Sequence, residues 1–128
     1  MTEPLREPII RVDDVAFPRF QAPDLDEMEV FLHAFGLHTS AKTADAFYAR
    51  GTDADHHVHV THRGEAAFLG LAFDAEREDL DRLAEATGTS VESLDEPGGG
   101  SVVHLSDPDG RRVDVVAGIE ALAPLDVR

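Results

Sequence analysis

The sequence predicts an α+β fold of two βαβββ modules in a pseudo-twofold repeat, with curved mixed sheets that enclose a cleft and with helices outside. Two observations support this fold class. The order of a strand, a helix and then two or three strands occurs twice, over about residues 9–63 and 67–118. The first strands of the two halves also match, VAF at Val15–Phe17 with LAF at Leu71–Phe73. Each repeated unit leaves one sheet face needing a partner, so the two units are expected to pair.

The first module begins after an extended arm at residues 1–8. Residues 9–17 are expected to form its first strand, and Pro18 and Pro23 to bracket a loop, because proline does not fit a central strand. Two further strands are expected at 44–50 and 56–62, separated by a polar turn.

The helix of the first module has a clear start signal. Asp24 is expected to be its N-cap, with Glu27 at the capping-box position three residues later. Apolar residues recur at helical spacing, and Gly36 follows as a stop signal. These apolar residues, which we interpret as core rather than as a cofactor contact, are Leu25, Met28, Phe31, Leu32 and Phe35.

The second module repeats this order. A strand is expected at 68–73, a helix at 78–87 closed by Gly88, and a short strand at 90–94. The sequence Pro97-Gly98-Gly99-Gly100 indicates a loop.

The hairpin at 101–116 completes the second module. Asp107-Pro108-Asp109-Gly110 supplies the turn, since proline presets φ and glycine tolerates positive φ. Asp114 lies between two valines, so alternation places its carboxylate on the opposite face, either in solvent or lining a polar cleft. Residues 119–128 leave the pattern and are interpreted as a tail or linker.

Composition excludes several classes of function. With 128 residues and 42% apolar content, the chain is long enough for one globular domain. Acidic residues outnumber basic ones 26 to 11, for a net charge of −15, which argues against nucleic-acid and anionic-membrane partners. There is no cysteine, and no apolar run approaches a membrane span of roughly 20 residues. The N-terminus does not look like a signal peptide, so the expected location is the cytoplasm.

The repeat, the Asp107–Gly110 turn with Asp114 four residues on, and the VAF and LAF strands together resemble the vicinal-oxygen-chelate superfamily. This superfamily includes glyoxalase I, bleomycin-resistance proteins and extradiol ring-cleaving dioxygenases. The glycine run at 97–100, Asp55-His56-His57 and the tail at 118–125 look most like the N-terminal half of a two-domain extradiol dioxygenase. In such enzymes the C-terminal half usually holds the iron, and the N-terminal half is a metal-free structural duplicate.

The resemblance implies where a metal would lie. The ligand of the first strand falls on Asp14, its counterpart in the second half on Gly70, and the last-strand acid on Asp114. In the first half the equivalent last-strand position lies near His57 and His59, which face the cleft if Val58 and Val60 face the helix. One imidazole and two carboxylates could hold Fe, Mn, Zn or Ni as a divalent ion. Because Gly70 has no side chain, we favour no metal in this chain alone.

Three functions remain open. The first is a domain related to ring-cleaving dioxygenases of catechol-type aromatics, acting with a metal-bearing half. The second is a metal-free small-molecule binding protein of the drug-resistance type, and the third a divalent-metal lyase or isomerase of the glyoxalase type. Whether the chain is an enzyme stays open, and the expected partners are a small aromatic or apolar molecule and a second copy or similar domain. The expected cleft-lining residues are Phe17, Phe47, Tyr48, Phe68, Gly70 and His104.

Overall fold

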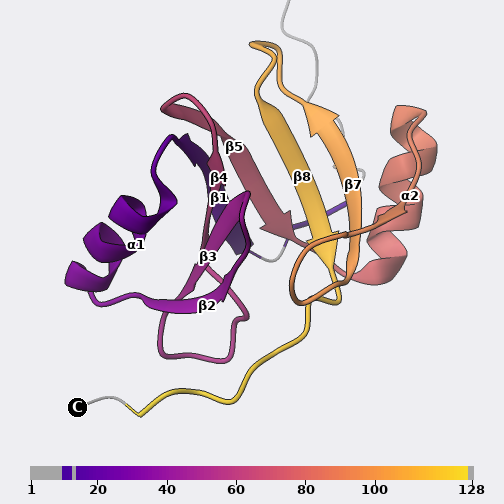
Figure 1. The fold of residues 1–128 in the computed structure, drawn as a ribbon. Helices are drawn as coiled ribbons and strands as arrows, with labels where there is room; N and C mark the ends of the chain where they lie inside the picture. The colour runs from indigo at the N-terminus through magenta and orange to yellow at the C-terminus, as the bar shows by residue number, and fades with distance from the viewer. Residues whose placement is uncertain (1–9, 13, 127–128) are drawn as a thin grey trace, which may run out of the picture.

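A computed structural model describes residues 10–12 and 14–126. The expected arm at 1–8, together with Ile9 and Asp13 of the expected first strand, lies outside the described residues. Within them the chain forms one eight-stranded mixed sheet in the order β2-β3-β4-β1-β5-β8-β7-β6, with α1 and α2 at its two flanks (Figure 1). The first-module elements are β1 (Asp14–Ala22), α1 (Leu25–Ala34), β2 (His38–Lys42), β3 (Ala46–Arg50) and β4 (His59–Arg63). The second-module elements are β5 (Ala67–Asp74), α2 (Arg77–Thr87), β6 (Glu92–Ser93), β7 (Ser101–Ser106) and β8 (Arg112–Ala117).

The α+β repeat is therefore confirmed, with one difference in how the modules meet. They join edge to edge through the antiparallel pair β1 and β5, so the sheet is continuous, curved and not closed. In each module the first and last strands run parallel, β1 beside β4 and β5 beside β8. Four strands from both modules, β4, β1, β5 and β8, thus lie side by side in the middle of the sheet.

Local sequence chemistry sets the start of α1 and the end of α2. The Asp24 carboxylate accepts a hydrogen bond of 3.0 Å from the backbone N–H of Glu27, as the N-cap signal predicted. Gly88 ends α2 in the left-handed conformation at φ 69°. Neither helix of the described residues is long and apolar enough to cross a membrane.

The apolar stripe of α1 is narrower than expected. Leu25 and Leu32 are buried against Phe47 of β3, but Phe31 and Phe35 are 55% and 73% exposed. The last two rings pack on each other, with centroids 4.9 Å apart, rather than on the sheet. Helical spacing put them near the stripe, but a single sheet surface covers only one side of a helix.

In the first module one strand prediction is corrected and one further strand is found. β1 runs through Pro18, which pairs with Leu71 of β5, so the proline does not open a loop. It is tolerated because β1 begins to pair with β4 only at Arg19 and because register shifts lie on either side of it. β2 has the polar sequence HTSAK, which carries no alternating pattern, and was not predicted.

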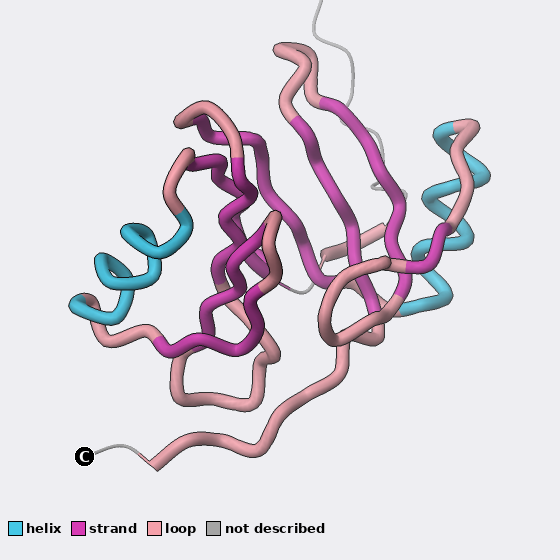
Figure 2. Tube along the Cα trace, viewed as in Figure 1, coloured by secondary structure: helices cyan, strands magenta, loops and turns pink. Residues whose placement is uncertain are grey.

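The sheet has an inner face and an outer face. On the inner face Phe17, Tyr48, Val60 and Val102 form one buried cluster with residues of both modules. The outer face is covered by the helices, α1 over β3 and α2 over β7 and β8. The tail at 118–126 runs beside the loop before β4 (Figure 2), and its Leu122 N–H donates to the Ala54 carbonyl.

Candidate functional site

A network of charged side chains lies on the inner face, at the junction of the modules. Its centre is Arg19 of β1, which is fully buried. Arg19 faces inward because it is two residues after Phe17, and the β5 residue opposite it is Gly70. A side chain at Gly70 would collide with the neighbouring strand, since its Cβ would lie 1.8 Å from the Arg112 carbonyl oxygen.

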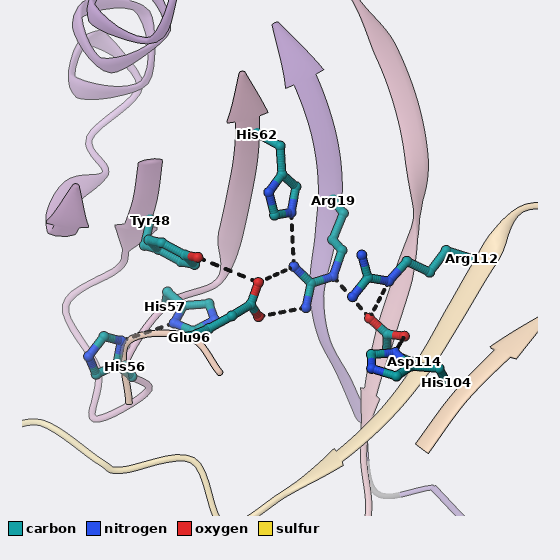
Figure 3. Close-up of polar contacts among 9 residues, drawn as sticks. All are labelled: Arg19, Tyr48, His56, His57, His62, Glu96, His104, Arg112 and Asp114. Carbon is teal, nitrogen blue, oxygen red and sulfur yellow. Dashed lines mark hydrogen bonds and ion pairs between the residues drawn. The ribbon is translucent and has the colours of Figure 1, made fainter. Parts of the chain in front are cut away.

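The Arg19 guanidinium joins two carboxylates (Figure 3). Its two terminal nitrogens each donate to one oxygen of Glu96, both at 2.7 Å, in a bidentate pair. Its Nε donates to Asp114 Oδ2 at 3.0 Å. Bidentate guanidinium–carboxylate pairs are among the strongest hydrogen-bonded contacts in proteins. Here the bidentate pair connects β1 with the loop after β6, and the single Nε bond connects β1 with β8.

Asp114 is held by three donors from three strands. Besides Arg19, Arg112 donates from Nε to Oδ2 at 2.9 Å, and His104 Nδ1 contacts Oδ1 at 2.7 Å. The carboxylate is fully buried, so these contacts replace its hydration. Two guanidinium groups and two carboxylates therefore balance in charge at the centre of the network.

The electrostatics of the network favour this ionised arrangement. Burial alone would lower the pKa of Arg19, but the hydrogen bonds and charges of Glu96 and Asp114 raise it above its usual value. Burial alone would likewise raise the pKa of Glu96, but Arg19 holds it below its usual value. Burial, helped by the charge of Arg19, lowers the pKa of His62. Because a guanidinium only donates, His62 Nε2 accepts the 3.0 Å bond from Arg19 and its ring is in the neutral Nδ1–H form.

Two aromatic neighbours border the network. Burial and then the Glu96 charge raise the pKa of Tyr48 to about 12, so its hydroxyl keeps its proton and points at Glu96 Oε2 from 3.4 Å. His57 packs between Tyr48 and Phe17, and burial lowers its pKa to about 4. Its Nδ1 contacts Nδ1 of His56 at 2.9 Å, and its buried Nε2 has no partner among the described residues.

The structure does not gather the four expected metal ligands. Asp14 is exposed and lies opposite Asp74, whereas the β5 residue beside Asp114 is Ala72. His57 and His59 were expected on one face, but His59 stacks on Phe20 of the outer face. Within the described residues, no three His, Asp or Glu side chains are grouped as a metal site.

The inner face therefore does not fit a divalent ion. The position between the carboxylates of Glu96 and Asp114, which a cation would prefer, is taken by the Arg19 guanidinium. Asp114 has its oxygens engaged by three donors, and Gly70 offers no ligand atom. A metal here would have to displace a buried positive charge from its two counter-charges.

The expected cleft-lining residues divide between the two faces. Phe17 and Tyr48 are on the inner face, Gly70 lies opposite Arg19, and His104 belongs to the network through its contact with Asp114. Phe47 and Phe68 are not cleft residues: Phe47 is buried under α1, and Phe68 contacts Phe20 on the outer face. Phe47 precedes Tyr48, and consecutive strand residues point to opposite faces, so the two could not share the cleft.

A separate cavity of about 380 Å³ lies at the end of the sheet near the tail. It is formed where β1, the loop before β4, the end of β5 and the tail meet. Its lining includes Phe17, Asp55, His56, His57, Ile119 and Glu120. His57, whose Nε2 has no hydrogen-bond partner among the described residues, lines this cavity, but the carboxylates of Glu96 and Asp114 do not.

Four members of the network were not among the site residues predicted from the sequence: Arg19, His62, Glu96 and Arg112. Arg19 carried a signal, because alternation from Phe17 places it on the same face once β1 is known to continue through Pro18. Glu96 carried none, since it comes from a glycine-rich loop whose path depends on tertiary packing. Its neighbour in sequence Leu94 is buried in the inner cluster and fixes that path.

No protein-family model matches the sequence, and no curated protein matches it. Several solved structures, by contrast, are similar to this chain. A Mn(II)-bound glyoxalase from Novosphingobium aromaticivorans is 26% identical with a TM-score of 0.82, over 93% of this chain and 43% of that one. Homoprotocatechuate 2,3-dioxygenase from Brevibacterium fuscum, in an anaerobic complex with 3,4-dihydroxyphenylacetate, is 25% identical with a TM-score of 0.78. That match covers 91% of this chain and 40% of the dioxygenase.

These likenesses confirm the expected superfamily. The chain is a glyoxalase- and extradiol-dioxygenase-like domain of the vicinal-oxygen-chelate superfamily. It spans less than half the length of the glyoxalase and dioxygenase chains that it matches.

Proposed function

We propose that this chain is a metal-free companion domain that acts together with a metal-bearing domain of the same fold. The observation that carries this proposal is the Arg19 guanidinium between Glu96 and Asp114. Together with Arg112, this guanidinium neutralises the two carboxylates that would otherwise attract a metal ion. The domain then contributes a stable sheet and an interface, while the partner domain supplies the metal chemistry.

The lengths of the similar chains agree with this role. The glyoxalase and the dioxygenase are each more than twice as long as the part that this chain matches, which leaves room for a second domain in them. The partner of this chain would be such a domain, in the same protein or in another, or a second copy. The substrates of the pair would be small aromatic molecules of the catechol type.

A metal-free binding protein is the second candidate. It is favoured by the cavity of about 380 Å³ near the tail, which lies within the usual size of small-molecule sites. Phe17 supplies an apolar wall, and His57 supplies a ring that burial keeps neutral. A glyoxalase-type lyase is the weakest candidate, since Gly70 has no ligand atom and Arg19 opposes a metal.

Metal binding tests the proposal most directly. Tag-free protein is titrated with Fe(II), Mn(II), Zn(II) and Ni(II), alongside an Asp114→Asn variant and an Asp109→Asn control in the exposed β7–β8 turn. We expect at most weak binding that all three proteins share. One tightly bound ion per chain, lost only in Asp114→Asn, would refute the metal-free role.

Turnover gives an independent readout. The chain alone, incubated with Fe(II) under anaerobic conditions and then exposed to oxygen, is assayed with 3,4-dihydroxyphenylacetate. We expect no ring cleavage. Sustained cleavage by the isolated chain would show that it needs no metal-bearing companion. A ligand-dependent rise in melting temperature that is lost in a His57→Leu variant would instead favour the binding-protein candidate.

A further inference from the structure

Glu96 differs from the other members of the charged network because it comes from a loop. Arg19, Asp114, Arg112 and His104 project from strands of the sheet, β1, β8 and β7, whereas Glu96 lies between β6 and β7. The three glycines that follow it, Gly98 to Gly100, all have positive φ, of 92°, 62° and 104°. Glycine adopts these angles without steric cost, so the loop can fold back tightly, with the Gly99 N–H donating to the Glu96 carbonyl oxygen at 2.9 Å.

The groups that receive the Glu96 carboxylate are arranged as a carboxylate-binding site. Both terminal nitrogens of Arg19 donate to it at 2.7 Å, and the Tyr48 hydroxyl lies 3.4 Å from Oε2. The two terminal nitrogens of the planar guanidinium, which we call the fork, can donate to both oxygens of a carboxylate at once. An ammonium group cannot do this in the same plane.

The fork is held in place without help from Glu96. Asp114 fixes Arg19 Nε at 3.0 Å, and His62 accepts from Nη1 at 3.0 Å. The Phe17 ring lies 4.9 Å from the guanidinium carbon. Donors that are already oriented lose little entropy when a ligand binds, so the site is preorganised for a carboxylate from any source.

We propose that Arg19 and Tyr48 form a binding site for a small carboxylate, and that Glu96 fills this site as an internal ligand which an external carboxylate displaces. The exchange replaces one carboxylate by another on the same donors, so the charge balance of the network is kept. The Glu96 side chain is 12% exposed, which marks the loop side as the entrance. Phe17, Tyr48 and Leu94 make the surroundings apolar, so carboxylates with a short apolar or aromatic body fit best.

This arrangement predicts that Glu96 competes with the ligand. An external carboxylate can bind only those molecules in which Glu96 has left the site. The apparent affinity of the intact protein is therefore the affinity of the empty site multiplied by the fraction of such molecules. Removing the Glu96 carboxylate should therefore strengthen binding rather than weaken it. The carboxylate site does not depend on the companion role, because it involves neither a metal nor a second domain.

The test uses acetate, which corresponds to the atoms that Glu96→Ala removes. We expect Glu96→Ala to bind acetate at least tenfold more tightly than the wild type. At ten times the dissociation constant, acetate should raise the melting temperature of this variant by about 3 to 6 °C. Acetamide, which is similar in shape but neutral, should give no such shift.

Two variants serve as matched controls. Glu96→Gln fills the same space without the charge, so it should leave no room for acetate. Arg19→Met combined with Glu96→Ala removes the fork and should abolish the gain in affinity. Equal acetate affinity in Glu96→Ala and the wild type, or binding retained without Arg19, would overturn the proposal.

A measurement on the wild type keeps the proposal testable if Glu96→Ala does not fold. Benzoate at about 100 mM should shift the NMR signals of the Arg19 Nε–H and of the Gly98–Gly100 amides, and benzamide should not. Unchanged signals with benzoate, or equal changes with both compounds, would show that no external carboxylate displaces Glu96.

Discussion

Replacing His57 by leucine should protect the fold against acid. His57 is buried, with only 4% of its surface exposed. Its ring packs on those of Phe17 and Tyr48, at centroid distances of 4.6 Å and 5.1 Å. Burial, helped by the neighbouring His56, lowers the pKa of His57 to about 4. The Glu96 charge acts in the opposite direction but does not offset burial.

The size of the effect follows from the difference in proton affinity. In the unfolded chain the ring has an ordinary pKa of 6.5, against about 4 in the folded protein. Each pKa unit corresponds to about 1.4 kcal/mol. The unfolded state therefore gains about 3 kcal/mol relative to the folded state by binding the His57 proton, a gain that is complete once the pH has fallen below both values.

The sign is fixed by which state takes up the proton first. Below pH 6.5 the unfolded chain becomes protonated at His57 while the folded protein does not, so stability falls as the pH drops from about 6.5 to about 4. His57→Leu removes this proton-linked loss. Urea unfolding of both proteins at pH 7, 5.5 and 4 should show the variant gaining on the wild type by up to about 3 kcal/mol.

The prediction concerns how the difference in unfolding free energy between His57→Leu and the wild type changes with pH. It therefore does not depend on how well leucine packs at pH 7. His38→Leu is the matched control, because it also replaces a histidine by leucine but at an exposed position. If the stabilities of wild type and His57→Leu stay parallel to within about 0.5 kcal/mol from pH 7 to pH 4, His57 is not held neutral by burial. The reasoning about its environment would then be wrong.

Three further predictions concern the fold and the network. Arg19→Met should lower the free energy of unfolding, measured with urea, by about 3 to 5 kcal/mol, because it leaves buried carboxylates unpaired. A loss below about 1 kcal/mol would mean that these carboxylates find other partners or water. Gly70→Ala should lower the free energy of unfolding by about 3 kcal/mol or more, since the new Cβ would collide with the Arg112 carbonyl oxygen. Gly51→Ala should lower it little, because no atom lies within 4 Å of the new Cβ. Equal losses in the two variants would contradict the close approach at Gly70. Asp24→Ala should cost about 1 kcal/mol through its lost cap, and Glu76→Ala, whose side chain makes no cap hydrogen bond, should not; thermal unfolding of both variants compares them directly.

The elements that the sequence predicted best are those set by neighbouring residues. The Asp24 cap depends on a side chain and a backbone amide three residues apart. In the β7–β8 turn, the Asp107 carboxylate accepts from the backbone amides of Asp109 and Arg111, and Gly110 takes a φ of 83°. Such contacts form within a few residues, so residue type and spacing are enough to predict them.

The side on which a strand residue lies was predicted less well. A shift of one residue moves a side chain to the other face. His59 was expected in the cleft, but β4 pairs His59 with Ala49 and Val60 with Tyr48, and this register places His59 on the outer face. Phe47 and Phe68 were likewise expected in the cleft, but Phe47 is buried under α1 and Phe68 contacts Phe20.

By itself, the sequence determined the two-module α+β fold, most of its helices and strands and the superfamily to which it is similar. Repeat order, caps and turn residues are local properties that survive without knowledge of the packing. Only the tertiary structure decided what occupies the inner face. Arg19, Glu96 and Asp114 are separated in sequence by 95 residues at the widest, and only the pairing of β1 with β5 and of β5 with β8 brings them together. The charge balance on the inner face depends on which distant residues the strand pairing brings together, and a local sequence pattern does not contain that information.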